Sequence, residues 1–449
     1  DWYGFLTSIF FTSFVGISLV FANFGQKMTD ISVRDTFLLT SASWVILVLF
    51  SCLPFLFALI DMSFTEAFFE AMSGLTTTGA TILYGLDEAP PGILLWRSIL
   101  QWIGGIGIIV FALAILPMLN IGGMQLFRTE SSDRSEKILP RARQLSAAIG
   151  IIYLSLTFIC GLLYYFNGMN LFDAINHALT TISTGGFSTH DESISFFDNQ
   201  KIEIILLVFT IICSIPFIIY IQIFYHGNFK ALFKDSQIKW FFIILLISIT
   251  AMVLWIQQTQ GYTLQEAIRY GSFSVITIIT TSGFVLEDHS LWGSFAITFI
   301  FLGCVMGGCT GSTTGGIKIF RYQILATTAK HQISHLMQPH GVIRSQFNRK
   351  PVSAEVESSV MSFFILFAFC FLIIAIFLSA TGLDYLASMS AAAAAIANVG
   401  PALGPIVGPH GNYSSLTDAA KWILSIAMLI GRLELFTIFV LFSKYFWRD

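Results

Sequence analysis

The sequence predicts an all-α polytopic membrane protein built from four pseudo-symmetric repeats. Hydrophobic residues make up 55% of its 449 residues and charged residues only 11%, whereas soluble domains carry about 25% charged residues. Several apolar runs are long enough to cross a bilayer, and between them lie shorter segments that end in Gly, Thr and Ser. The net charge of −3 is too small to indicate a nucleic-acid-binding protein.

Nine apolar stretches approach the roughly 20 residues that a helix needs to cross the hydrocarbon core of a bilayer. They cover residues 2–22, 36–60, 92–120, 145–166, 202–225, 238–256, 291–305, 360–379 and 420–446. The seventh is short and runs into the glycine-rich residues 303–316, so we expect a broken helix that continues beyond Ile317. The first lacks the basic region and the cleavage site of a secretory signal. We interpret it as a membrane helix and expect further residues before Asp1.

Four shorter, half-apolar segments have the length of re-entrant half-helices. They cover residues 64–75, 171–182, 264–279 and 384–396, and each ends in Gly and small polar residues. Irregular backbone at membrane depth is tolerated only where protein buries it or where it lines water. A long helix, a short helix, a glycine-containing segment and a second long helix thus recur about every hundred residues. The pattern predicts four helix–pore-helix–filter–helix repeats around one central pore.

The glycine junctions after the short segments have the chemistry that a dehydrated cation requires. Backbone carbonyls can replace its hydration shell, and Gly permits the positive φ and close approach that point them inward. The C-terminal end of each half-helix is partly negative, which also favours a cation. One junction alone is more simply a helix C-cap, but four at matching positions indicate a filter. Aligned on their glycines, the predicted ion-binding residues are Thr78, Gly79, Thr184, Gly185, Ser282, Gly283, Val399 and Gly400.

Charge predicts the orientation of these junctions. Basic residues crowd the connections between repeats: Lys27, Arg34, Arg128, Arg134, Lys137, Arg141, Arg143, Lys230, Lys234, Lys239, Arg321, Lys330, Arg344, Arg349 and Lys350, with Lys444 and Arg448 at the end. Acidic residues lie beside the junctions: Asp87, Glu88, Asp191, Glu192, Glu287 and Asp288. Lys- and Arg-rich loops stay cytoplasmic, so all four junctions are expected to face outside. There the acids would raise the local concentration of cations.

Residues 76–81, 183–188, 281–284 and 398–401 resemble the four selectivity-filter segments of the Trk/Ktr/HKT superfamily of potassium transporters. The resemblance covers residues 36–449 and includes the sequences QWIGG at 101–105 and GRLE at 431–434. It implies a potassium-selective ion-conducting subunit of a bacterial uptake system, in the inner membrane, with K⁺ as the transported ion and no enzymatic activity. Gly in all four filters accompanies potassium selectivity in this superfamily, whereas plant relatives with Ser in the first filter favour sodium.

The resemblance also implies partners and boundaries. Such proteins form homodimers and bind a cytosolic nucleotide-binding regulatory ring (TrkA-like) on their basic face. They usually carry two helices before the first repeat, and only one is present here, so we expect a truncated start. The expected divisions are an N-terminal helix and linker at 1–30, then repeats at 31–127, 128–230, 231–345 and 346–449.

Glycines and small polar residues break the third repeat after residue 305. The segment contains Gly307, Gly308, Gly311, Ser312, Gly315, Gly316 and Lys318. It is not a nucleotide-binding P-loop, because that motif needs Gly directly before Lys and a hydroxyl residue after it, and here Ile residues flank the Lys. The alternatives are a kink that only packs helices and, as the resemblance implies, an intramembrane gate loop in the third repeat.

Arg432 lies within an apolar run, where a charge is costly unless it meets water or a partner. The resemblance implies that it points into the pore below the filter and regulates flux. The alternative is a structural ion pair with Glu434 or with a carboxylate of another helix. Residues two apart on a helix do not face each other, which disfavours Glu434 as the partner.

Two other functions compete with a channel. The first is a potassium symporter coupled to H⁺ or Na⁺, which usually needs a buried carboxylate or His. The second is a membrane-embedded enzyme, but the chain has no HExxH or GxSxG motif. His177, His190 and His289 lack metal-ligand spacing and are interpreted as polar packing residues. The six widely spaced cysteines are interpreted as small buried side chains.

Overall fold

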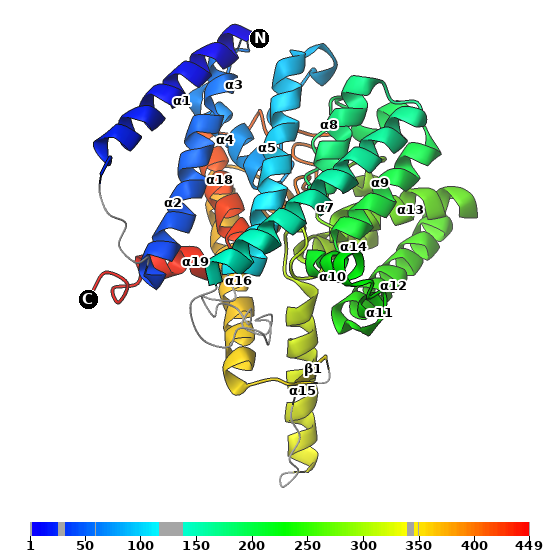
Figure 1. The fold of residues 1–449 in the computed structure, drawn as a ribbon. Coiled ribbons are helices and arrows are strands. Elements are labelled where there is room, and N and C mark those ends of the chain that lie inside the picture. Colours follow the sequence, from blue (N-terminus) through cyan, green and yellow to red (C-terminus); the bar gives the residue numbers. More distant parts are fainter. Residues whose placement is uncertain are drawn as a thin grey trace.

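The computed structural model describes residues 2–25, 32–58, 60–115, 138–338, 345–348 and 350–448 (Figure 1). After α1 (Trp2–Ala22), the first repeat contains α2 (Val33–Ser51), α3 (Leu53–Phe57), α4 (Phe64–Leu75), η1 (Leu86–Glu88), α5 (Pro91–Val110) and η2 (Phe111–Ile115). The second contains α7 (Ile138–Phe166), α8 (Leu171–Ile182), η4 (Ser193–Phe197), α9 (Gln200–Cys213) and α10 (Phe217–His226).

α11 (Lys230–Lys234) crosses the expected boundary between the second and third repeats at 230/231. The third repeat continues with α12 (Ser236–Thr259), α13 (Leu264–Ile279), η5 (His289–Leu291), α14 (Ser294–Val305) and α15 (Ile319–Met337). The fourth begins with the antiparallel pair β1 (Gln346–Phe347) and β2 (Lys350–Pro351). It continues with α16 (Ala354–Ala380), α17 (Tyr385–Ala397), α18 (Asp418–Arg432), α19 (Phe436–Phe439) and η6 (Val440–Phe442). The end of α15 projects beyond the other helices (Figure 1).

The four short segments form helices close to their predicted bounds. α4, α8 and α13 begin and end at the predicted residues, and α17 is shifted by one residue. Their starts are fixed by side-chain caps: in two of them a capping box joins Ser63 with Glu66 and Thr263 with Glu266. In α8 and α17 the side chains of Asn170 and Asp384 cap the first turn by accepting from a backbone N–H, without a capping box.

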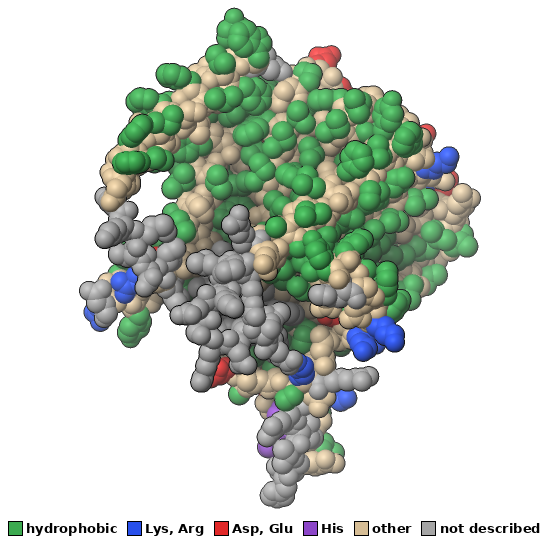
Figure 2. All heavy atoms as spheres, viewed as in Figure 1, with side chains coloured by type: hydrophobic (Ala, Val, Ile, Leu, Met, Phe, Trp, Pro, Cys, Tyr) green, Lys and Arg blue, Asp and Glu red, His purple; other side chains and the backbone are tan. Residues whose placement is uncertain are grey.

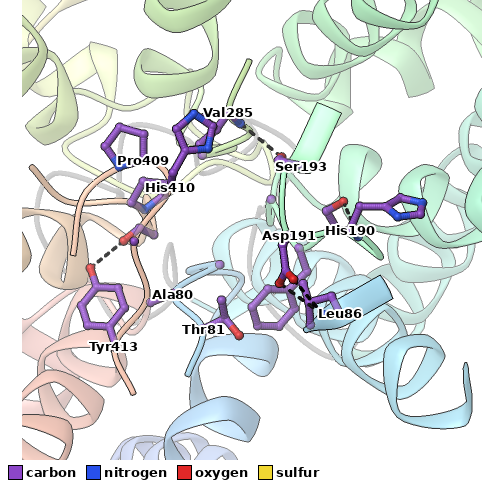
Figure 3. Close-up of a pocket in the computed structure, with 18 of the residues that line it drawn as sticks. Ala80, Thr81, Leu86, His190, Asp191, Ser193, Val285, Pro409, His410 and Tyr413 are labelled. Carbon is purple, nitrogen blue, oxygen red and sulfur yellow. Dashed lines mark hydrogen bonds between the residues drawn. The ribbon is translucent and has the colours of Figure 1, made fainter. Parts of the chain in front are cut away.

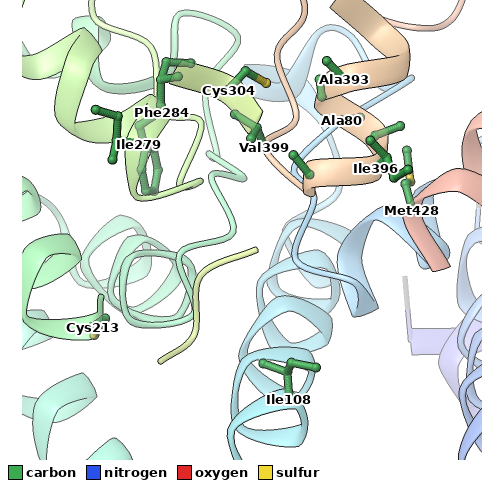
Figure 4. Close-up of a cluster of buried hydrophobic side chains, with 14 of the residues drawn as sticks. Ala80, Ile108, Cys213, Ile279, Phe284, Cys304, Ala393, Ile396, Val399 and Met428 are labelled. Carbon is green, nitrogen blue, oxygen red and sulfur yellow. The ribbon is translucent and has the colours of Figure 1, made fainter. Parts of the chain in front are cut away.

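Each short helix packs against a helix that follows the short helix of the preceding repeat, and the fourth repeat packs back onto the first. The contacts are α5 with α8, α9 with α13, α14 with α17 and α18 with α4. The four repeats therefore form a closed cycle within one chain. α17 fits closely because residues 391–395 are all Ala and are almost fully buried. Apolar side chains such as Ile279, Phe284 and Val399 belong to one buried hydrophobic cluster at the ends of the short helices (Figure 4).

Two of the nine expected crossings are bent helix pairs instead of continuous helices. Six described helices are long and apolar enough to cross a membrane, or up to eight if each bent pair counts as one span. Residues 202–225 form α9 and α10, bent by 89°, because Pro216 lacks an N–H and disfavours a helical residue before it. Residues 420–446 bend by 104° after α18, where Glu434 and Leu435 both have positive φ. The third-repeat helix is broken between α14 and α15, as expected.

The outer surface is that of a multi-pass membrane protein. Apolar side chains cover the outer helices (Figure 2), and the most hydrophobic stretch of α16 has a mean hydropathy of 3.0. All six cysteines are buried and unbonded, as expected. The basic residues Lys27, Arg128, Arg134, Lys137, Arg344 and Arg349 lie outside the described residues, and so do the expected boundaries at 30/31 and 127/128.

Candidate functional site: a ring of backbone carbonyls

The four short helices end in the same backbone turn. The five residues that begin in each turn are called ring segments 1 to 4 (residues 77–81, 184–188, 281–285 and 398–402). The first residue of each has a φ between 51° and 55°, and the N–H of the second bonds at 2.9 Å to the carbonyl five residues earlier. This is the Schellman pattern of helix ends. Three of the four first residues are Thr, which is strained at positive φ, so surrounding contacts must hold the turn.

The third residue of every ring segment is a glycine that packs onto the next segment. Its φ lies between 66° and 99°. A Cβ added to Gly79 would lie 2.2 Å from the carbonyl oxygen of Gly185, and one added to Gly186 would lie 2.1 Å from that of Ser282. A Cβ added to Gly283 would lie 2.1 Å from the carbonyl oxygen of Val399, and one added to Gly400 would lie 2.4 Å from that of Thr78. Segment 1 thus faces 2, 2 faces 3, 3 faces 4, and 4 faces 1. The carbonyls of the second residues form a closed ring, which we call the carbonyl ring, and a side chain on any of these glycines would clash with it.

The second repeat differs from the predicted alignment by one residue. Gly186, and not Gly185, has the positive φ and matches Gly79. Gly185 occupies the second position, with its carbonyl in the ring, and Thr184 occupies the first. Two consecutive glycines made the register ambiguous in the sequence, and the backbone conformation resolves it. The other predicted residues are placed as aligned, with Thr78, Ser282 and Val399 in second positions and Gly79, Gly283 and Gly400 in third.

A cavity of about 80 Å³ lies on one side of the carbonyl ring (Figure 3). Its lining includes all four third-position glycines. Around them lie loop residues such as Asp191, His410 and Tyr413. The Tyr413 hydroxyl donates to the Gly400 carbonyl at 2.8 Å, one residue beyond the ring. The cavity therefore opens directly onto the backbone of the four segments.

Acidic residues beside the cavity also hold its loops in place. Asp191 accepts from the backbone N–H of Leu86. His190 bonds to both Asp87 and Asp173, the second at 3.1 Å. Burial lowers the pKa of His190, but its hydrogen bonds to the two aspartates outweigh this and raise the pKa above the ordinary value of 6.5. His190 is therefore an ion-pair partner, beyond the polar packing role expected from the sequence.

A buried ion pair, which the sequence reasoning missed, joins ring segments 1 and 2. Arg97 on α5 and Glu70 on α4 are 1% and 0% exposed and bond at 2.7 Å. Arg97 also donates to the Thr81 hydroxyl at 3.0 Å and to the Ser188 carbonyl at 3.2 Å. Its guanidinium lies over the ring of Phe187. The missed signal was an ionisable residue inside an apolar segment, the same signal that singled out Arg432.

The loop between α14 and α15 lies on the other side of the carbonyl ring, away from the cavity. Its residues 306–318 include every glycine, Ser312 and Lys318 expected there. It bonds to ring segments 2 and 3 and to the end of α17: the hydroxyls of Thr184 and Thr313 lie 3.1 Å apart, Gly315 N–H donates to the Thr281 hydroxyl at 2.7 Å, and Gly316 N–H donates to the Ala397 carbonyl, directly before segment 4, at 2.8 Å. The loop is thus bound directly beneath the ring.

Arg432 is buried against this loop. It donates to the carbonyls of Thr313 at 3.1 Å and Gly104 at 3.3 Å, and is 2% exposed. Glu434 pairs with Arg321 on α15 instead of with Arg432. The alternative of an Arg432–Glu434 ion pair is therefore not what the structure contains.

Apolar outer helices around a closed ring of carbonyls define a multi-pass membrane transport protein. The chain matches the TrkH family, described as cation transport protein, over residues 4–448. It therefore belongs to this family, which confirms the resemblance seen in the sequence and makes it a transport protein and not an enzyme.

Several characterised proteins are similar to the chain over most of its length. It is 40% identical to the Trk system potassium uptake protein TrkI of Halomonas elongata, over 92% of the chain and 84% of the relative. It is 36% identical to the Trk system potassium uptake protein TrkH of Escherichia coli (strain K12), over 99% and 92%. The crystal structure of the potassium transporter TrkH from Vibrio parahaemolyticus matches with a TM-score of 0.90 and 36% identity, covering 100% of this chain and 93% of that one.

Proposed function

We propose that the chain is the potassium-selective ion-conducting subunit of a bacterial potassium-uptake system. Dehydrated K⁺ would pass through the carbonyl ring, which replaces its hydration shell with backbone oxygens. The observation that carries the proposal is the closed cycle of four glycine–carbonyl contacts. The names of the relatives, all Trk system potassium uptake proteins, support potassium as the ion.

The predicted filter residues keep their role in this proposal, with Gly186 added to them. The pore helices aim their partly negative C-terminal ends at the ring, so the field at the ring favours a cation. The carbonyls of Thr78, Gly185, Ser282 and Val399 are the proposed ligands. The facing glycines allow the close approach that such a ring needs.

The 306–318 loop is the proposed gate. Its position beneath ring segments 2 and 3 and the end of α17 obstructs a path that continues through the ring, so conduction requires the loop to move. Arg432 adds a positive charge at the same place, bonded to the loop carbonyl of Thr313. The charge would oppose cation passage until the loop and Arg432 move together.

A coupled symporter with H⁺ or Na⁺ is the second candidate. Proton coupling needs a buried acid that can exchange its proton. Among the described residues, the buried carboxylates Glu70, Glu203 and Glu434 are each paired with an Arg, and the buried Asp173 is paired with His190, so each of the four already has a partner. This favours passive conduction over coupling.

Location and partners are proposed on the same basis. The chain would lie in the inner membrane with the cavity side of the ring outside. It would form a homodimer and bind a cytosolic nucleotide-binding ring (TrkA-like) on the side that carries basic residues such as Lys230, Lys234 and Lys330.

Ion flux into liposomes that contain only the purified chain tests the proposal. Potassium is compared with sodium, with and without a proton gradient, for the wild type, Gly79→Ser and Gly85→Ser. A Cβ at Gly79 would lie 2.2 Å from a ring oxygen, whereas Gly85 also has a positive φ but has nothing within 4 Å of its Cβ position. We expect potassium-selective flux that is indifferent to pH, with the selectivity relaxed in Gly79→Ser and unchanged in Gly85→Ser. Flux that requires a proton or sodium gradient would establish the symporter instead.

A further inference from the structure

One ring carbonyl is bonded to a side chain from the neighbouring repeat. Gln101, on α5 of the first repeat, donates through Nε2 to the Gly185 carbonyl at 2.6 Å. Its Oε1 accepts from the N–H of Phe187 at 3.1 Å. The side chain is fully buried. One amide group therefore spans ring segment 2 and fixes both a ring oxygen and the backbone two residues further on.

Gln101 occupies the space that a side chain fills in the other three segments. The second position carries Thr78, Ser282 and Val399 in segments 1, 3 and 4, but Gly185 in segment 2. A Cβ added to Gly185 would lie 2.3 Å from both Cδ and Oε1 of Gln101. The missing side chain and the glutamine are thus complementary, because only a glycine leaves room for the amide.

The fourth repeat shows the opposite combination. Gly104 and Gly431 are matching positions, because a Cβ on either would meet a pore-helix carbonyl, that of Leu75 at 1.8 Å and that of Ile396 at 2.0 Å. Three residues before each glycine stand Gln101 and Met428. The apolar Met428 lies on α18, the helix that neighbours segment 1. There the second residue is Thr78, and its own hydroxyl accepts a hydrogen bond from the Asn398 amide at 3.0 Å.

We propose that Gln101 is a positioning residue for cation selectivity, which holds the Gly185 oxygen at its place in the carbonyl ring. This rests on the proposed function of the ring as a selectivity filter. Discrimination between potassium and sodium requires either a fixed ring size or a fixed number and strength of carbonyl dipoles. Without the amide, segment 2 loses two backbone-directed hydrogen bonds, and its oxygen is free to shift toward a smaller ion.

The first test replaces Gln101 by Met, the residue at the matching position of the fourth repeat. Met has nearly the same volume but cannot make either hydrogen bond. In liposome flux we expect the potassium-to-sodium permeability ratio to fall by about fivefold or more, as the loss of two hydrogen bonds implies. The matched control is Gln323→Met on α15, whose buried amide donates to the Ser236 carbonyl at 2.8 Å away from the ring. We expect a similar loss of thermal stability there but an unchanged ratio.

A second test uses the complementarity directly and does not depend on Gln101→Met folding. Gly185 lies outside the left-handed region, so Gly185→Ala adds no left-handed strain, and the three atoms nearest to its Cβ all belong to Gln101. We expect Gly185→Ala to lower the ratio, and Gln101→Ala to lower it no further when added to Gly185→Ala. The inference would be overturned if Gly185→Ala and Gln101→Ala lowered the potassium-to-sodium ratio independently, so that their effects multiplied in the double variant. It would also be overturned if the ratio of Gln101→Met stayed within about twofold of the wild-type ratio. Wild-type protein without potassium preference would instead refute the proposed filter itself.

Discussion

The buried pair Arg97–Glu70 provides the sharpest test of how the ring is supported. Replacing Arg97 by Met removes the 2.7 Å bond to Glu70 and the donors to Thr81 and Ser188. Glu70 then keeps only the Thr81 hydroxyl and the N–H of Ile82 as partners. Removal of one member of a buried ion pair typically costs about 3–5 kcal/mol, because the remaining charge is left uncompensated.

We therefore expect Arg97→Met to lower the free energy of unfolding in detergent by about 3–5 kcal/mol. The double variant Arg97→Met/Glu70→Gln removes both charges, so its cost should be well below the sum of the two single costs. Chemical denaturation monitored by tryptophan fluorescence gives all three values, with wild type as the reference. A loss below about 1 kcal/mol for Arg97→Met, within the range of an exposed pair, or strict additivity in the double variant, would refute this reasoning.

Three further predictions test other parts of the site. Gly283→Ala places a Cβ 2.1 Å from a ring oxygen and should abolish potassium preference in the flux assay, whereas Gly85→Ala should cost only about 1–2 kcal/mol of backbone strain and keep it. Thr281→Val removes a hydroxyl that accepts from the proposed gate loop and should raise the initial potassium flux at an unchanged ion preference; a lower flux contradicts this. Because the pKa of His190 is raised by its aspartate partners, the stability from these ion pairs is complete below about 6.5 and is lost as pH rises through the raised pKa. The unfolding midpoint of wild type, but not that of His190→Asn, should fall across this window.

Local signals in the sequence were sufficient for the pore helices and most of the ring. Caps such as Ser63 and Thr263 mark helix starts with short-range chemistry that a sequence displays directly. The glycines at 79, 283 and 400 mark the places where a side chain would meet a carbonyl. Repetition of these signals four times made the prediction of a shared path robust.

What the sequence left undetermined depends on contacts between distant residues. Both Gly185 and Gly186 could fill the third position of segment 2, and only packing against Ser282 selects Gly186. The partners of Glu70 and of Glu434 likewise lie on other helices, 27 and 113 residues away along the chain. A single sequence shows that a charged residue lies in an apolar segment, where burying it is costly. It does not show which distant residue pairs with that charge.

The four ring segments have nearly the same backbone geometry, but different hydrogen bonds hold them in place, and some of these hydrogen bonds come from the 306–318 loop. Segments 2 and 3 are bonded to the 306–318 loop through Thr184 and Thr281, and Ala397 at the end of α17, directly before segment 4, is bonded to it as well. Segment 1 is held instead by the Arg97–Glu70 pair through Thr81. A displacement of the loop therefore removes hydrogen bonds from segments 2 and 3 and from the residue before segment 4, and leaves the support of the first intact. Three of the turns also contain a strained Thr at positive φ that depends on such contacts. Any movement that opens the loop must therefore also loosen the ring above it, unless supports such as Gln101 on the neighbouring helix hold the carbonyls in place.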